Sequence, residues 1–303
     1  MEINSDLSSK DVMAYKVPPG EYLSPLVDSV FKAIFKKNKK ILQSFLNSIL
    51  DLNIINPDDI QIADSEIPID SANEKVNRLD LNCNAYICGK PHQINIEVQL
   101  LNENYESDRF FSYLSKLHGS YLDKGQSYES IPKTIGLIIT NYNCNEIDYY
   151  NEYAMTNLKT GIKLTNKFSL YYLHLKKFQK TIVESDCIKD YWILFLKSRR
   201  IEDFNMLKYE DKELEAAVNE LERASQNHEA VIAYARELRY RGREEFYRAK
   251  AISEAVSEAV TVAVSEAVSE EKLNTARSFK SSNVDVDIIA SCTGLTREEV
   301  LAL

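Results

Sequence analysis

The chain has 303 residues, of which 44% are hydrophobic and 27% are charged, and its formal net charge at pH 7 is −9. This length suffices for one large core with an appendage or for two domains, and the composition excludes a disordered or collagen-like chain. No run of about 18 apolar residues occurs, and residues 1–10 lack a basic start and an apolar stretch, so we expect neither a transmembrane helix nor a secretory signal.

The cysteines and the charge distribution further limit which class of protein this can be. The five cysteines are scattered, without a Cys-x-x-Cys pair, which is typical of reduced thiols in a cytoplasmic protein rather than of a zinc site. The negative net charge argues at first against an enzyme of nucleic acids, because phosphate contacts come from Lys and Arg. However, residues 251–303 carry −5 and residues 28–250 only −2. The body of the chain is therefore nearly neutral and can still contact phosphates locally.

The pattern of apolar residues predicts helices and strands that alternate and then give way to helices alone. Residues 1–20 end in Pro-Pro-Gly and are expected to be flexible. Apolar residues at helical spacing predict a helix from about Pro25, with Ser24 as its cap. The further predicted elements, in chain order, are a helix over 39–50, a strand over 58–69, a helix over 103–124, strands over 134–140 and 168–175, and helices from Ile188 to the end. This order predicts an α/β core followed by a helical C-terminal region.

Two strand-like runs carry the most informative polar residues. Residues 79–85 and 94–100 alternate apolar with polar side chains, and a turn-like Gly-Lys-Pro at 89–91 separates them. In a hairpin, Glu97 and Gln99 would share one face, with Val98 buried beneath them and Asp80 near that face. Mg²⁺ is commonly held by one or two carboxylates with waters and substrate phosphates. The pair therefore predicts a metal site, and the alternative is a solvated strand face that carries these residues by chance.

The chain resembles a known family from about residue 26 to residue 178. The carboxylates, the segments 28–35 and 46–50, the aromatic stretch 109–113 and residues 125–128 follow the order found in the recombination-promoting nuclease (Rpn) branch, also labelled transposases, of the PD-(D/E)XK nuclease superfamily. The resemblance implies a restriction-endonuclease-like core, a mixed central sheet flanked by helices. It also implies a deoxyribonuclease dependent on Mg²⁺ or Mn²⁺ that acts in DNA recombination or in defence against foreign DNA.

The resemblance also assigns roles to residues of the hairpin. Asp80, Glu97 and the main-chain carbonyl of Val98 would bind the metal, and Glu97 or Gln99 would position the attacking water. The superfamily generally has a lysine where this chain has Gln99, and a neutral amide can only form hydrogen bonds. The Rpn branch commonly shares this glutamine, and the cation would then come from elsewhere, with Lys32 and Lys124 as candidates. A catalytically decayed fold that serves as a DNA- or partner-binding module remains the alternative.

Residues outside the hairpin complete the expected site. Related nucleases often place an acidic residue at the position of Asp28, where it touches the metal or its waters. Lys32 lies four residues later on the same helical face, so the alternative for the two is a surface ion pair. Lys32 and Lys36 belong to a basic segment over 32–40 that would follow phosphates or simply be solvated. Arg109 would face the phosphate or be a plain surface arginine. The expected DNA-binding residues are therefore Lys32, Lys36, Arg109 and Lys124.

The C-terminal tail has a different kind of sequence. We divide the chain into a flexible N-terminus (1–20), a nuclease domain (21–185), a helical extension (186–250) and an acidic tail (251–303). Residues 253–268 repeat Ser-Glu-Ala-Val with one variation, so that an Ala/Val stripe winds slowly around a helix. We expect this stripe to join two copies in a homodimer. The alternatives are a low-complexity spacer and a regulatory cover over the DNA groove. Residues 282–300 predict two short helices around a turn, with too little positive charge to indicate DNA binding.

Overall fold

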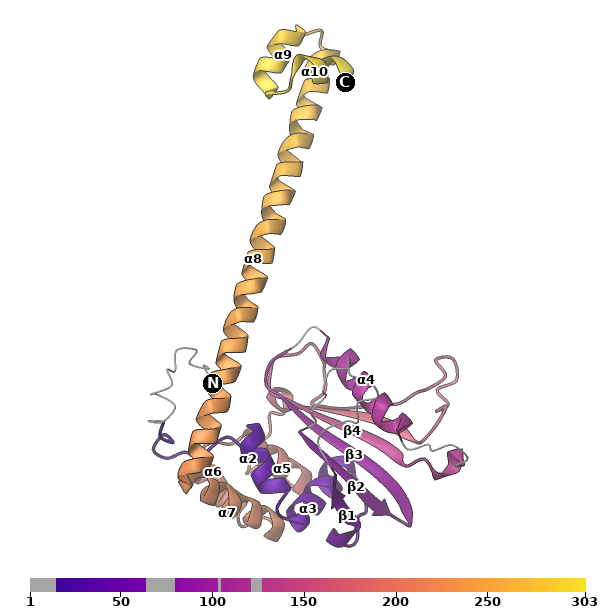
Figure 1. Ribbon diagram of the computed structural model, residues 1–303, viewed down its shortest axis with the longest axis vertical. Coiled ribbons are helices and arrows are strands. Elements are labelled where there is room, and N and C mark those ends of the chain that lie inside the picture. The colour runs from indigo at the N-terminus through magenta and orange to yellow at the C-terminus, as the bar shows by residue number, and fades with distance from the viewer. Residues whose placement is uncertain (1–14, 64–79, 103–104, 121–126) are drawn as a thin grey trace. The chain divides into compact units, whose positions relative to one another are not determined.

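A mixed six-stranded sheet forms the centre of the first of two compact units, Met1–Arg241 and Gly242–Leu303. The computed structural model describes residues 15–63, 80–102, 105–120 and 127–303. The strand order is β1-β2-β3-β4-β6-β5 (Figure 1). β3, β4 and β6 are parallel, and the other strands pair antiparallel with their neighbours. The strands are β1 (Ile60–Ile62), β2 (Leu81–Ile87), β3 (Lys90–Gln99), β4 (Lys133–Thr140), β5 (Tyr150–Tyr153) and β6 (Phe168–His174).

The predicted hairpin is confirmed as β2 and β3, but the predicted turn at 89–91 is displaced, because Lys90 and Pro91 pair with β2 as part of β3. Leu81 pairs with Ile96 and Ile87 pairs with Lys90, which leaves a two-residue turn. Cys88 and Gly89 in this turn have φ values of 50° and 73°, as a hairpin turn with the twist of the strands requires. Because the register runs antiparallel, Asp80, the residue before β2, comes opposite Glu97.

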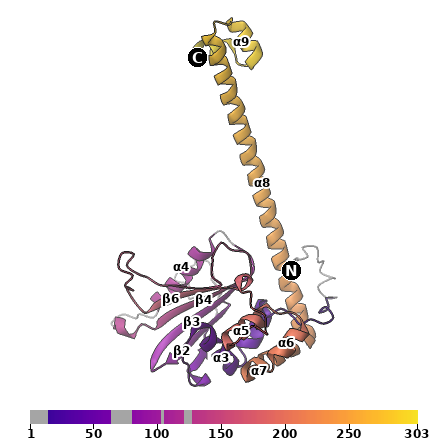
Figure 2. The same ribbon diagram turned by 180° about the vertical axis from the view of Figure 1, so that it is seen from behind.

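The two faces of the sheet differ in chemistry. One face is apolar and packs against α2 (Asp28–Phe35), α3 (Lys39–Leu50) and α5 (Ile188–Lys197), which lie on one side of the sheet in Figures 1 and 2. The other face carries α4 (Glu106–Gly119), whose Phe110 packs on Ile138 and Tyr172. Side chains alternate along a strand, so Asn95, Glu97 and Gln99 lie on the α4 face while Ile94, Ile96 and Val98 enter the core. The polar residues of the sheet therefore gather beside α4.

A glycine allows α4 to lie close to the sheet. A Cβ atom at Gly136, in the middle of β4, would stand 2.3 Å from Cδ1 of Leu114 and 3.0 Å from Cδ1 of Leu170. Leu114 is 1% exposed, so the helix has little room to retreat without losing buried surface. The distance between α4 and β4 thus depends on the absence of a side chain at residue 136.

Helices from later in the chain complete the same core. α6 (Ile201–Leu207), α7 (Lys212–Gln226) and the first turns of α8 (His228–Ser281) contribute Phe204, Leu214 and Tyr234 to it. The carboxylate of Glu237 in α8 accepts hydrogen bonds from the main-chain N–H groups of Asp28 at 2.9 Å and of Ser29 at 3.2 Å. These are orphan donors at the N-terminus of α2, where a negative charge also complements the helix dipole. The start of α2 is therefore fixed by a residue about two hundred positions later.

Some predicted bounds are wrong for identifiable reasons. The first helix begins at Asp28 rather than near Pro25, and the hydroxyl of Ser24 accepts from Leu26 N–H in the preceding turn instead of capping it. α4 ends at Gly119, and parts of the predicted elements at 64–69 and 121–124 lie outside the described residues. β5 was not predicted, because Tyr-Asn-Glu-Tyr lacks an apolar alternation. The predictions for 39–50, 134–140 and 168–175 are confirmed to within one residue.

The second unit contains the remainder of α8 with α9 (Val286–Thr293) and α10 (Arg297–Ala302). The two short helices confirm the prediction for 282–300. Ala276, Ile289 and Val300 form a small buried core, and Thr296 and Glu299 form a capping box at the start of α10. The valines of the repeat are 46–56% exposed. Within the described residues, no helix is long and apolar enough to cross a membrane.

Candidate active site

Asp80 is held at the end of the hairpin by a main-chain hydrogen bond. Its Oδ2 accepts from the N–H of Val98 at 2.7 Å, which ties the residue before β2 to the end of β3. Burial raises the pKa of Asp80 to about 6, and the negative charge of Asp28 adds to this rise. The Val98 N–H and the positive charges of Lys32 and Arg241 lower the pKa again, but they do not offset the burial.

Glu97 lies opposite Asp80 and is only 4% exposed. Burial, and next the charge of Asp80, hold the pKa of Glu97 well above its usual range. A hydrogen bond from Asn95 Nδ2 at 3.4 Å, the Asp80 main chain and the more distant charge of Arg109 act in the other direction. Burial thus disfavours the ionised form of both carboxylates, and the charge of Asp80 disfavours it further at Glu97. A pair of this kind is suited to a divalent cation, which binds carboxylate oxygens and cancels their repulsion.

The amide of Gln99 lies beside a guanidinium group. Arg109, in the first turn of α4, donates a hydrogen bond from Nη2 to Oε1 of Gln99 at 3.3 Å. Its Cζ also stands 5.1 Å from the ring centroid of Phe110, so the side chain lies along the helix and not out in solvent. The sequence predicts Lys32 and Lys124 as sources of the cation that the superfamily places on the strand, and this stays a prediction, with Lys124 outside the described residues. Arg109 is a further positive charge, and the structure places it beside Gln99.

Asp28 and Lys32 form the ion pair that their spacing allowed. The two Asp28 carboxylate oxygens lie 2.7 and 2.8 Å from Lys32 Nζ, and the side chains are 33% and 30% exposed. Asp28 is close enough to Asp80 for its charge to raise the pKa of that residue. Lys36 follows the last turn of α2 and is partly buried. The pair lies near the carboxylates from the apolar side of the sheet, and a direct role in metal binding stays a prediction.

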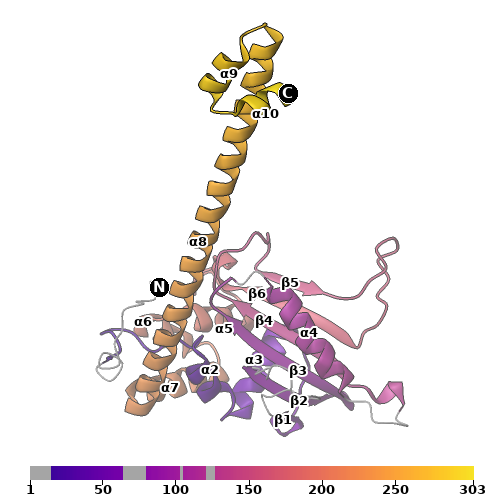
Figure 3. The ribbon, with the colours of Figure 1, turned by 45° about the horizontal axis from the view of Figure 1, so that its top comes forward.

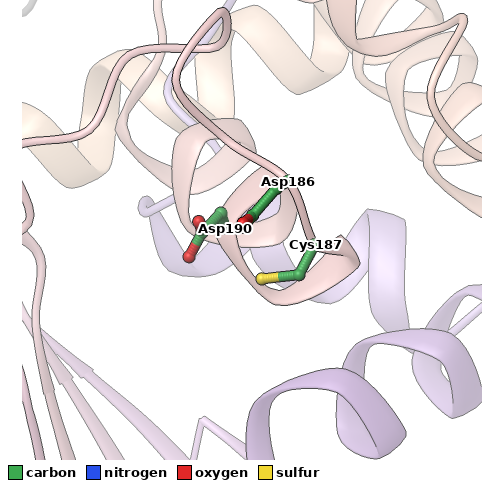
Figure 4. Close-up of side chains that lie close together, drawn as sticks. All are labelled: Asp186, Cys187 and Asp190. Carbon is green, nitrogen blue, oxygen red and sulfur yellow. The ribbon is translucent and has the colours of Figure 1, made fainter.

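A second group of possible ligands occurs at the start of α5. In the part of the chain that the structure describes, the one trio of His, Cys, Asp or Glu ligand atoms within 4.8 Å of one another comprises Asp186, Cys187 and Asp190 (Figure 4). No motif in the sequence singled it out. The Lys180 ammonium lies 2.6 Å from Asp190 and 3.7 Å from Asp186. Because this ammonium already supplies a positive charge to the group, we assign no metal to it.

The sequence analysis also did not predict the residues that lie beside Gln99 on the neighbouring strands. Gln99 is the neighbour of Thr140 in β4, and Thr140 is the neighbour of His174 in β6. The hydroxyl of Thr140 and Nδ1 of His174 are 2.8 Å apart. On α4, the buried Glu106 accepts hydrogen bonds from Tyr142 O–H at 2.9 Å to each oxygen. Only the strand order makes these residues neighbours, so no sequence pattern pointed to them.

The comparison with protein families agrees with this geometry. A family model described as "PD-(D/E)XK nuclease family transposase" matches residues 25–255, about three quarters of the chain. The matched region contains the hairpin, α4 and the helices that complete the core. The comparisons with curated proteins and with solved structures found no significant match. From the family match and the mixed sheet flanked by helices, we conclude that the chain belongs to the PD-(D/E)XK nuclease family transposases and has a restriction-endonuclease-like α/β fold.

Proposed function

We propose that the protein is a deoxyribonuclease that hydrolyses phosphodiester bonds with Mg²⁺ or Mn²⁺ held by Asp80 and Glu97. The observation that carries this proposal is the pair itself: the hairpin register brings two carboxylates opposite each other, and burial raises the pKa of both. Two neighbouring buried negative charges are unfavourable unless a cation binds between them. The donor set is entirely oxygen, which suits a hard divalent cation.

Each residue has a role that follows from its position. The Val98 N–H engages one oxygen of Asp80. The other oxygen would hold the cation, together with Glu97 and the Val98 main-chain carbonyl. The bound cation would lower the pKa of a water molecule and neutralise charge on the phosphate. Glu97 or Gln99 accepts a hydrogen bond from the attacking water and so orients it. Arg109, which already contacts Gln99, directs its positive charge toward the phosphate.

The remaining assignments complete the proposed DNA site. Lys32, Lys36 and Lys124 are proposed as phosphate contacts, and Asp28 as an acceptor for water molecules of the site. We propose that the enzyme acts in the cytoplasm, in DNA recombination or in defence against foreign DNA. What supports the cytoplasmic location is the sequence pattern of five scattered cysteines without a Cys-x-x-Cys pair.

The tail supports a proposed homodimer. Val256, Val260, Val264 and Val268 recur every four residues along α8 and remain about half exposed within their own chain. The same stripe on a second copy offers a surface of matching chemistry, and closed two-fold dimers are the commonest soluble assembly. A dimer would bring two metal sites to one DNA molecule.

A plasmid-nicking assay tests the enzyme. Wild-type protein should nick supercoiled DNA with Mg²⁺ or Mn²⁺ and not in EDTA. Asp80→Ala and Glu97→Ala should each lower the rate by at least about a hundredfold while they remain folded. Glu202→Ala, which removes a carboxylate that is 75% exposed on α6, is the matched control and should nick like the wild type. Wild-type cleavage by either site variant would refute the assigned site.

The same assay separates the second candidate function, a decayed fold that binds DNA without cutting it. The neutral Gln99 in place of lysine is the observation that favours this candidate. A folded wild-type protein that binds DNA in gel shifts but nicks it with neither Mg²⁺ nor Mn²⁺ would favour the binding module and reject the enzyme.

A further inference from the structure

A pocket opens beside the proposed metal site at the carboxyl ends of β4 and β6. It has a volume of about 550 Å³ and lies between the start of α4, the loop after β4 and strands β5 and β6. Figure 3 shows α4 lying across one face of the sheet, next to β5 and β6. Its size falls in the range of pockets that enclose small organic groups. Of its described lining residues, Phe111 alone belongs to a segment that carries the family resemblance, the aromatic stretch 109–113.

The strand register places the pocket next to the carboxylates. Glu97, Ile138 and Tyr172 are neighbours across β3, β4 and β6, and so are Gln99, Thr140 and His174. Tyr172 and His174 line the pocket, two strands away from Glu97 on the same face. Two strand spacings amount to about 10 Å. A nucleotide whose phosphate lies at Asp80 and Glu97 can therefore extend its own base, or the adjacent base, into the pocket.

The walls of the pocket suit a flat aromatic ring. The rings of Tyr172 and His174 are stacked with an interplanar angle of 25°, and Tyr153 meets Tyr172 edge-on at 5.6 Å between centroids. Phe111 adds a ring that is 48% exposed at the α4 side. Bases stack on such rings with little dependence on sequence, because every base has a π face.

The polar groups of the pocket suit a neutral ligand. None of the described residues that line it is Lys or Arg, whereas Asp108 and Glu146 are present, so the pocket disfavours a phosphate. His174 is 3% exposed, and within the described residues its Nε2 has no hydrogen-bond partner. The amides of Asn143 and Asn145 add donors and acceptors of the kind that pair with base edges. The occupant is thus a neutral, planar and polar heterocycle.

We propose that this pocket holds one unstacked nucleobase of the strand whose phosphate lies at the Asp80–Glu97 site. This inference deepens the proposed nuclease function and rests on it for the position of the strand. The wall is formed before DNA binds, because Tyr142 is fixed to the buried Glu106 by two hydrogen bonds of 2.9 Å. A base fits only if it is single-stranded or turned out of a duplex.

Binding of free deoxynucleosides to the full-length protein in EDTA tests the pocket apart from the chemistry. The probes are deoxyadenosine, deoxyguanosine, deoxycytidine and thymidine, with deoxyribose as the negative control, observed by saturation-transfer NMR. We expect saturable binding of at least one deoxynucleoside and none of deoxyribose. Tyr153→Ala should weaken binding about tenfold, since one stacking ring is lost. Tyr209→Ala, which removes a tyrosine that is 90% exposed and does not line the pocket, should leave it unchanged.

Either of two outcomes would contradict the pocket proposal. In the first, no deoxynucleoside binds to the wild type. In the second, Tyr153→Ala and a second rim variant, Phe111→Ala, both bind deoxynucleosides as well as the wild type does. Asp80→Ala should still bind deoxynucleosides, so lost cleavage with retained binding separates the metal site from the pocket. If the wild type nicks DNA but binds no deoxynucleoside, the nuclease proposal stands and the pocket proposal fails; the reverse result leaves the pocket and rejects the nuclease.

The source of the base is tested with DNA substrates in Mg²⁺. We expect Tyr153→Ala to lower kcat/KM on a single-stranded oligonucleotide about tenfold relative to the wild type. An equal loss on fully paired duplex would show that the enzyme turns a base out of the stack, and a loss confined to the single strand would identify unpaired DNA as the source. If kcat/KM is unchanged on both substrates, the pocket takes no part in holding the DNA strand.

Discussion

Arg109 Nη2 and Gln99 Oε1 form a hydrogen bond of 3.3 Å that joins the first turn of α4 to the end of β3. The family resemblance implies that Gln99 occupies the position at which the superfamily generally carries a lysine. The positive charge near the proposed phosphate position therefore comes from a helix that packs on the sheet and not from the strand itself. In the proposed nuclease, activity would therefore depend on the position of α4 against the sheet.

We predict that the cation can be moved from the helix back to the strand. Arg109→Ala should lower the cleavage rate by at least about tenfold, because one charge near the developing phosphate charge is lost. Gln99→Lys alone should keep or raise activity, and Gln99→Lys combined with Arg109→Ala should regain part of the loss. Initial rates of plasmid nicking measure all three. Lys116→Ala, which removes an exposed positive charge from the same helix, is the control. A folded but inactive Gln99→Lys protein would show that the amide has a specific role.

The carboxylate pair predicts opposite effects of one substitution with and without metal. In EDTA, Glu97→Gln should raise the melting temperature, because it removes one of two like charges that burial brings together. Mg²⁺ at about 100 times its Kd should stabilise the wild type by about 2.7 kcal/mol and should leave the variant unchanged. Differential scanning fluorimetry measures the melting temperatures of the wild type and the variant, in EDTA and with Mg²⁺. A wild-type melting temperature that does not respond to Mg²⁺ or Mn²⁺ would contradict the metal site.

The same pair predicts a pH dependence of the metal-free protein. The folded-state pKa of Asp80 is about 6 and its ordinary value is 3.8, so the folded state binds more protons than the unfolded state between these values. The pair's contribution to stability therefore falls as pH rises through this window. Urea unfolding in EDTA from pH 4 to pH 7.5 should show this decline in the free energy of unfolding. Asp80→Asn should remove the part of the decline that comes from Asp80. Identical pH profiles for the wild type and Asp80→Asn would contradict the raised pKa.

How much of the site the sequence predicts depends on which contacts are local. The period-two pattern around Asp80 and Glu97, with the turn at Gly89, is enough to predict the hairpin, because its register follows from neighbouring residues. The approach of Arg109 to Gln99 and the row of Gln99, Thr140 and His174 depend instead on strand order and on helix packing. These properties involve segments far apart in the chain, so no local pattern contains them.

Gly136→Ala should loosen the helix that carries Arg109. The new Cβ would stand 2.3 Å from a methyl group of the buried Leu114, and overpacking of this kind costs about 1–3 kcal/mol. We expect a lower free energy of unfolding in urea and a lower nicking rate, since Arg109 lies one turn before Leu114. Gly119→Ala, at the end of the same helix, is the matched control, because no atom of the described residues outside its own helical backbone lies within 4 Å of the new Cβ. An unchanged stability of Gly136→Ala would show that α4 shifts without cost.

Truncation after Lys250 should lower the oligomeric mass and spare the metal site. The deleted segment carries the exposed valines of the repeat, which the proposed dimer would bury. Light scattering measures the mass, and the shift of the melting temperature with Mg²⁺ checks the site. In the full-length chain, Val260→Glu with Val264→Glu should have the same effect on mass, because both side chains are about half exposed in the single chain. If neither change alters the mass, the tail is a spacer or a regulator.

The hydrogen bonds from Asp28 and Ser29 to Glu237 have a consequence for synthesis on the ribosome. The hairpin with Asp80 and Glu97 leaves the exit tunnel early, whereas the carboxylate that fixes the start of α2, and Phe204, Leu214 and Tyr234 of the core, come more than a hundred residues later. A nascent chain that ends before Glu237 contains the proposed metal ligands but lacks the carboxylate that fixes the start of α2. For the proposed nuclease, the order of translation would therefore delay a competent active site until nearly the whole first unit has been made, and chains released early would not cut the DNA of the cell that makes them.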